Sequence, residues 1–173
     1  MKKILDVLGF KSVSALRKAV KNGDSNALEF LELLNEFLKG GIKSEDITVR
    51  GKVDFLNYMN IQMGYLKHEE FKVVFLNSSN QIVLNETLFC GTIDRSVVYP
   101  RLIIEKAILS KAKGVIFVHN HPSGNLTPSK KDIELTLEMQ ELLDKVDVKL
   151  LDHYIISETE NFSFYENGLI DYL

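Results

Sequence analysis

Cysteine is almost absent from this sequence: Cys90 is the only one in 173 residues. One thiol cannot form an intramolecular disulfide framework, and its isolation fits the reducing cytoplasm, where we expect the protein to be located. Cys90 stands beside Gly91 at the end of an expected strand, so we interpret it as a small apolar filler rather than as a nucleophile.

Long apolar runs are also missing. No stretch approaches the roughly 20 apolar residues that a membrane-spanning helix needs, so we expect no membrane partner. The basic residues Lys2 and Lys3 are followed by no sustained apolar run before Lys11, and we therefore expect no signal peptide.

Charge of one sign is not in large excess, since the formal net charge is -3. The whole chain therefore has little attraction for nucleic acid. Its first part is locally basic, with lysine or arginine at Lys2, Lys3, Lys11, Arg17, Lys18 and Lys21. Such a run is usually a solvated helix face, so a nucleic-acid partner is only a secondary expectation.

The hydrophobic pattern predicts an α/β fold, with a mixed β-sheet flanked by helices, behind an amino-terminal helical segment. We place that segment at residues 1–41, a linker at 42–50 and a metal-binding domain at 51–173. Helices are expected at residues 14–21, 25–38, 51–64, 99–111 and 130–144. Strands are expected at residues 71–76, 82–89, 114–118 and 150–157, with a short piece at 162–165.

The most informative stretch begins at His119 and His121, directly after an apolar run typical of a buried strand. Strand side chains alternate, so both imidazoles should project from one face at the strand's carboxyl end. Asp132 should lie in the first turn of the next helix and face them. Two imidazoles and one carboxylate leave a tetrahedral position open, which is the arrangement of a catalytic zinc ion.

A simpler interpretation of the last part of this stretch needs no metal. Ser129 is a good N-cap and Asp132 would be the third helical residue, which together predict a capping arrangement. Capping explains neither His119 nor His121, however, and we therefore favour a metal site.

Residues 119–132, HNHPSGNLTPSKKD, resemble the JAMM signature of the JAB/MPN metalloprotease superfamily, and more closely its RadC branch. The resemblance covers about residues 68–173 and implies the JAB/MPN fold, a layout similar to that of cytidine deaminases. It implies one Zn²⁺ held by His119, His121 and Asp132. It also implies a glutamate that acts on the attacking water, which points to Glu69, with Glu70 as the competing neighbour.

Two other metal-binding motifs that look similar do not fit this sequence. An HNH nuclease spreads its three residues over a larger unit, whereas here they are consecutive and the middle one, Asn120, should point away from its neighbours. Zinc deaminases use H-x-E with P-C-x-x-C, and this chain has no second cysteine.

The leading functional hypothesis is a zinc-dependent peptidase or isopeptidase that hydrolyses a peptide or protein substrate. Glu69 would be the general base, and Ser129 would donate a hydrogen bond to the oxyanion. One alternative is a metal-bearing interaction module in DNA repair or DNA metabolism with little or no hydrolytic activity, since the RadC proteins that the sequence resembles are traditionally labelled DNA repair proteins. Another is a scaffold whose metal only holds the loop to the following helix. Asp152 and His153 either support the site or are a polar pair that begins a strand.

The choice between Glu69 and Glu70 has a structural consequence, because neighbours on a strand point to opposite faces. If Glu69 faces the metal, the apolar side chains of Phe71, Val73 and Phe75 should lie under helix 130–144. Val74 and Leu76 should then pack on the other layer together with Glu70.

Overall fold

The computed structural model describes residues 12–31, 49, 51–90, 99–158 and 160–171. The chain divides into two compact units, Met1–Lys43 and Ser44–Leu173. Most of the expected linker at 42–50 and the second half of the expected helix at 25–38 lie outside the described residues, so the expected domain boundaries stay a prediction.

The first unit contains helix α2 (Val13–Lys21), which agrees with the helix expected at 14–21. Its N-cap is Ser12, whose hydroxyl oxygen accepts a hydrogen bond from the backbone N–H of Ala15 at 3.1 Å. Residues 25–31 form a second helical stretch. Both stretches carry buried apolar side chains, which are Leu16 and Val20 in the first and Ala27 and Leu31 in the second.

The second unit is built on a five-stranded sheet with the order β2-β1-β3-β4-β5. The strands are β1 (Glu70–Leu76), β2 (Ile82–Cys90), β3 (Gly114–Asn120), β4 (Lys149–Ile156) and β5 (Asn161–Ser163). Strands β3 and β4 are parallel, whereas the other neighbouring pairs are antiparallel. The expected mixed sheet is therefore confirmed.

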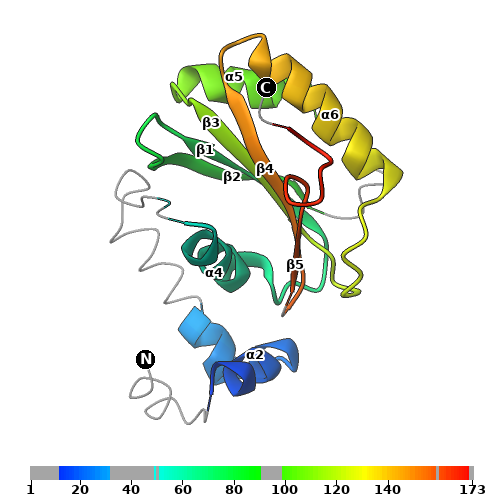
Figure 1. Ribbon diagram of the computed structural model, residues 1–173. Coiled ribbons are helices and arrows are strands. Elements are labelled where there is room, and N and C mark those ends of the chain that lie inside the picture. The colour runs from blue at the N-terminus through cyan, green and yellow to red at the C-terminus, as the bar shows by residue number, and fades with distance from the viewer. Residues whose placement is uncertain (1–11, 32–48, 50, 91–98, 159, 172–173) are drawn as a thin grey trace. The chain divides into compact units, whose positions relative to one another are not determined.

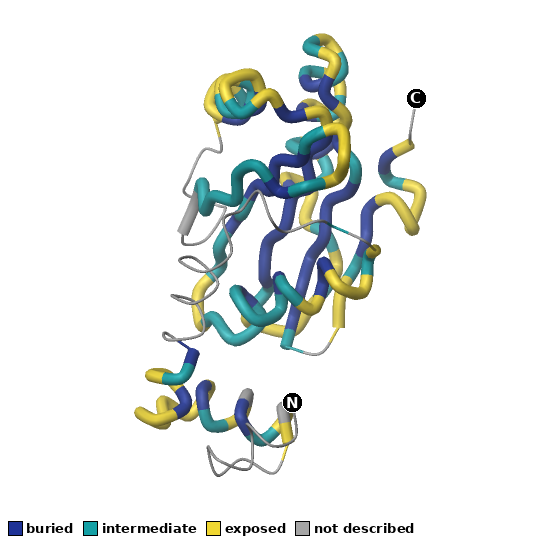
Figure 2. The backbone as a smooth tube through the Cα atoms, turned by 90° about the vertical axis from the view of Figure 1, so that its left-hand side faces the viewer, coloured by how far each residue is buried: buried dark blue, intermediate teal, exposed yellow. Residues whose placement is uncertain are grey.

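Helices cover both faces of this sheet (Figure 1). Helix α4 (Lys52–Met63) packs on one face, while α5 (Pro100–Leu109) and α6 (Lys130–Asp144) pack on the other. The middle strand, β3, is buried along its whole length, and Figure 2 shows the buried strands at the centre of the unit. A strand buried on both faces carries a continuous apolar run, as residues 114–118 do.

Strand β1 divides its side chains between the two layers as expected. Phe71, Val73 and Phe75 belong to the core formed with α5 and α6. Val74 and Leu76 belong to the core formed with α4. The alternation predicted for this strand is therefore confirmed. The core beneath α6 also contains Val115 and Phe117 of β3, which point to the same face of the sheet as His119.

Two corrections concern candidate site residues. Strand β3 continues to Asn120 rather than ending at residue 118, because His119 still pairs with Phe71 on one side and Ile155 on the other. Strand β4 begins at Lys149, so Asp152 and His153 lie in its interior. The interpretation of these two residues as a strand-initiating pair is therefore wrong.

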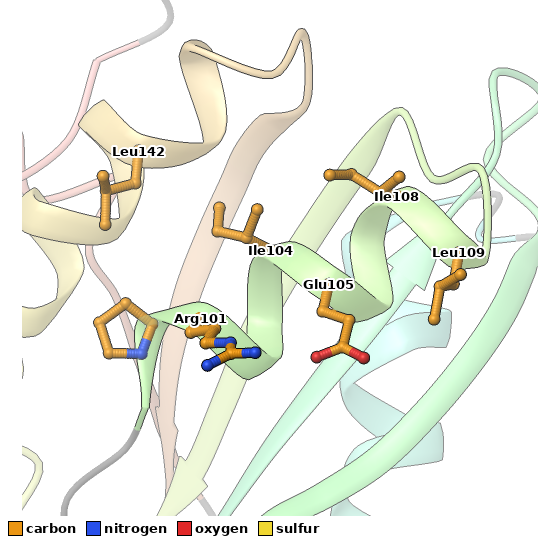
Figure 3. Close-up of a pocket in the computed structure, with 7 residues that line it drawn as sticks. Arg101, Ile104, Glu105, Ile108, Leu109 and Leu142 are labelled. Atoms are coloured by element: carbon orange, nitrogen blue, oxygen red, sulfur yellow. The ribbon is translucent and has the colours of Figure 1, made fainter.

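A groove of about 570 Å³ runs between α5 and α6 (Figure 3). Its lining is mostly apolar and consists of Pro100, Arg101, Ile104, Glu105, Ile108, Leu109 and Leu142. The groove shares no residue with the histidine cluster at the end of β3, so it is a separate surface feature.

Candidate metal centre

The end of β3 places two imidazoles side by side. His119 is fully buried, and His121 follows the strand, with its backbone N–H donating to the carbonyl of Ile156 at 2.9 Å. The two rings lie 4.7 Å apart between centroids. Their Nε2 atoms are 2.9 Å apart. Alternation along the strand therefore produces the pair of facing nitrogens that the H-x-H spacing predicts.

Asp132 reaches the same place from the first turn of α6, and it also caps that helix. Its Oδ2 accepts from the backbone N–H of Ser129 at 2.7 Å, and the Ser129 hydroxyl oxygen accepts from the backbone N–H of Asp132 at 3.1 Å. The capping arrangement considered above is thus present. The cap uses only Oδ2 of the carboxylate. The other oxygen, Oδ1, lies 3.7 Å from His119 Nε2. Capping and metal binding are therefore compatible.

The other carboxylate oxygen of Asp132 is the atom whose surroundings best fit a bound cation. Among the described residues, no hydrogen-bond donor reaches Asp132 Oδ1, although the residue is only 1% exposed. An ionised oxygen buried without a donor or a cation is costly. Such an atom beside two imidazole nitrogens is expected where a metal ion is the missing partner.

The protonation of the two histidines fits the same conclusion. His121 Nδ1 contacts the backbone carbonyl of Asn125, which can only accept, so a neutral His121 carries its proton there and its lone pair on Nε2. Burial lowers the pKa of His119 to about 4, an effect that Asp132 opposes and His121 reinforces. A neutral imidazole is the form that binds metals.

Taken together, one atom from each of His119, His121 and Asp132 lies within 4.8 Å of the others. The residues fit a metal ion, because two imidazole nitrogens and a carboxylate oxygen converge without enough protons to satisfy one another. The cluster can therefore hold a metal, and its geometry leaves the identity of the ion open.

The two carboxylates at the start of β1 differ in what they contact. Glu70 is engaged on the side away from the cluster, where its Oε1 lies 3.0 Å from His68 Nε2 and its Oε2 accepts from Thr87 Oγ1 at 3.3 Å. Glu69 is half-buried and directly precedes the strand. Its role as a general base, like the oxyanion contact of Ser129, stays a prediction.

The residue between the two candidate ligands holds the backbone around Glu69. Asn120 points away from the histidines, and its side-chain oxygen accepts from the backbone N–H of Glu70 at 2.8 Å. Its side-chain N–H donates to the carbonyl of His68 at 2.9 Å. Asn120 therefore holds the backbone on both sides of Glu69, through its bonds to the preceding and the following residue. The H-x-H spacing predicts only the direction of Asn120, so its partners were not anticipated.

Replacing Asn120 with alanine should loosen the backbone of residues 68–70 without changing the cluster of candidate metal ligands. The backbone N–H of Glu70 and the carbonyl of His68 would lose their partner, at a cost of about 1–3 kcal/mol of stability. Hydrogen–deuterium exchange should become faster at the Glu70 amide, while zinc affinity stays at the wild-type value. Asn85→Ala is a matched control, because Asn85 is a partly buried strand asparagine that donates to Tyr58 and Gln62. Equal exchange rates at Glu70 in all three proteins would contradict this role.

Asp152 and His153 serve different partners, although they are adjacent. The Asp152 carboxylate accepts from Ser163 Oγ at 2.6 Å and from the backbone N–H of Tyr165 at 3.1 Å, which ties the chain around β5 to β4. His153 faces the other layer, where its Nε2 lies 2.8 Å from His119 Nδ1. Of the two, His153 is the one that contacts the cluster.

Fold and site together define an α/β domain with a candidate metal centre at the end of its middle strand. Residues 49–169 match the family model described as RadC-like JAB domain. The chain therefore belongs to the RadC-like JAB domain family, as its sequence motifs predicted.

Bacterial relatives extend the likeness along most of the chain. The UPF0758 protein FN0909 of Fusobacterium nucleatum is 43% identical over 155 residues, which cover 84% of this chain and 67% of that protein. The UPF0758 protein YeeS of Escherichia coli is 43% identical over 113 residues, covering 65% of this chain and 76% of that protein. A UPF0758 protein of Clostridium botulinum is 36% identical over 168 residues, covering 96% and 74%.

Within the described part of the chain, no helix is both long enough and apolar enough to cross a bilayer.

Proposed function

We propose that this protein is a zinc-dependent peptidase or isopeptidase that hydrolyses an amide bond in a peptide or protein substrate. The observation that carries the proposal is the buried Asp132 Oδ1, which has no hydrogen-bond donor among the described residues and lies beside two facing imidazoles. Zinc suits this set, because it accepts imidazole and carboxylate ligands and keeps a tetrahedral position open at catalytic sites.

Each residue of the site has a defined task in this proposal. His119, His121 and Asp132 would hold the ion, which when bound polarises the scissile carbonyl and makes water more acidic. Glu69 would take a proton from the attacking water and deliver it to the leaving amine. The Ser129 hydroxyl accepts from the Asp132 N–H, so its own proton stays available to donate to the developing oxyanion.

The test is hydrolysis by the full chain after zinc has been restored, measured on peptides and on isopeptide-linked substrates. His121→Ala is the comparison, because it removes one ligand at a half-buried position at the end of the strand. We expect cleavage by the wild type and none above background by the variant. Equal cleavage by both would overturn the proposal. Metal binding without cleavage of any substrate would favour the interaction module instead.

A further inference from the structure

A line of hydrogen bonds leads from the cluster of His119, His121 and Asp132 into the core and returns to it. His119 Nδ1 lies 2.8 Å from His153 Nε2. His153 Nδ1 lies 2.6 Å from Thr136 Oγ1. The Thr136 hydroxyl donates to the backbone carbonyl of Asp132. The line therefore starts and ends at two candidate ligand residues, and it joins β3, β4 and α6.

These side chains are shielded from solvent, so their donors and acceptors must find partners within the protein. The side chains of His119, Thr136 and His153 are all 0% exposed. Burying a charged imidazole is costly, which favours the neutral form of both rings. A neutral imidazole has one N–H donor and one acceptor nitrogen, so each ring in the line has to donate on one side and accept on the other.

Two proton arrangements are possible with both rings neutral, and only the first gives every bond of the line a proton. In the first, Thr136 donates to the Asp132 carbonyl, His153 Nδ1–H donates to Thr136, and His119 Nδ1–H donates to His153. The Nε2 lone pair of His119 then faces the cluster. In the second, every bond between the side chains is reversed, and His119 carries its proton on Nε2, pointing at His121. Both arrangements hold the same number of protons.

We propose that Thr136, acting through His153, fixes the tautomer of His119 so that its Nε2 lone pair is turned toward the metal. The proposal rests on the metal site of the proposed function and names two positioning residues for it. The deciding contact is that of Thr136 with the Asp132 carbonyl, because a carbonyl accepts only and Asp132 lies one helical turn earlier on α6. The hydroxyl proton committed there cannot be given to His153.

The surrounding aromatic rings hold His153 in the orientation that this line needs. Its ring stacks on Phe164 with centroids 4.4 Å apart and an interplanar angle of 18°. Phe71 and Phe117 meet it edge-on, each with centroids 5.6 Å away. A ring packed on several sides in a dense core has little freedom to turn over, so its two nitrogens keep their partners.

Thr136→Val and Thr136→Ser separate this role from packing. Valine keeps the shape of threonine but gives His153 Nδ1 no acceptor, so a proton there would be buried without a partner. The second arrangement then prevails, and His119 presents an N–H to the ion. We expect the zinc affinity of Thr136→Val, measured by competition with a chelator, to fall by about 10- to 100-fold. Serine restores the hydroxyl and should recover most of the affinity.

Ser163→Ala is the matched control. It removes a buried hydroxyl that donates to the Asp152 carboxylate. Asp152 is the neighbour of His153 on β4, but it takes no part in the line of hydrogen bonds. It should lower thermal stability and leave zinc affinity at the wild-type value. Loss of affinity in the control equal to that in Thr136→Val would show a general effect of core damage and would overturn the proposal.

The tautomers can be read directly from ¹⁵N chemical shifts of the imidazoles in the zinc-loaded wild type. We expect His119 and His153 both to carry their protons on Nδ1. A proton on His153 Nε2, or wild-type affinity in Thr136→Val, would overturn the inference. None of these measurements uses hydrolysis. The inference therefore survives if the loaded protein cleaves nothing, whereas a wild type that binds no zinc refutes it together with the proposed site.

Discussion

Asp132→Asn should greatly weaken metal binding while the fold stays intact. Asparagine keeps a side-chain oxygen that can accept from the Ser129 N–H, so the start of α6 remains capped. Oδ1, which accepts no hydrogen bond from the described residues, is replaced by an uncharged NH₂ group, which has no lone pair for the ion. We expect zinc affinity to fall by more than about 100-fold, the upper end of the losses caused by changing a residue that only supports a ligand.

The same substitution should leave the metal-free protein as stable as the wild type, or more stable. The new NH₂ group can donate to the His119 lone pair that it faces, whereas the wild-type carboxylate only adds another acceptor. Calorimetry of the metal-free proteins measures this difference. Ser129→Ala is the complementary variant, since it should lose about 1 kcal/mol of stability with its cap and keep its zinc. Normal zinc binding by Asp132→Asn would leave capping as the only role of Asp132.

Glu69→Gln should remove hydrolysis and keep the metal. Glutamine has the shape of glutamate but cannot take a proton from water, and general-base catalysis contributes about 10²- to 10⁴-fold to a rate. Zinc affinity should not change, because Glu69 is not among the three clustered ligand residues. The paired measurements are the cleavage rate on the substrate found by screening and chelator competition for zinc.

Glu70→Gln is the matched control, one residue away and engaged with His68 and Thr87 on the other side of β1. It should cleave at nearly the wild-type rate. If Glu70→Gln lost activity and Glu69→Gln kept it, the base would have been assigned to the wrong carboxylate. Loss of zinc from Glu69→Gln would instead place that residue among the ligands.

Much of the site could be predicted because its parts are close in sequence. His119, His121 and Asp132 lie on one continuous strand–loop–helix segment, and strand alternation together with helix capping places all three. The layers of β1 followed from the same alternation, since Phe71 and Val74 differ in parity. Local periodicity is sufficient wherever one element decides the direction of a side chain.

The contact between His119 and His153 depends on information that a single sequence does not hold. The two residues are separated by 34 positions and meet only because β3 and β4 pair in a particular register. That register shifts between Val115 and Ile116, so that Ile116 pairs with Asp152. Without the extra residue in β4, Asp152 would occupy the face that His153 now takes. A one-residue irregularity therefore decides which side chain meets the cluster.

The position of Asp132 in the first turn of α6 has a consequence for the kinetics of ion exchange. Helix ends open far more often than a central strand such as β3, with free energies well below that of global unfolding. When the turn beginning at Ser129 frays, Asp132 moves away with it and the two histidines stay behind on the sheet. An ion held by the three residues would therefore have a route out that does not require the domain to unfold. Its residence time would be governed by the local stability of one helical turn, and a bound ion would in turn slow the fraying of that turn.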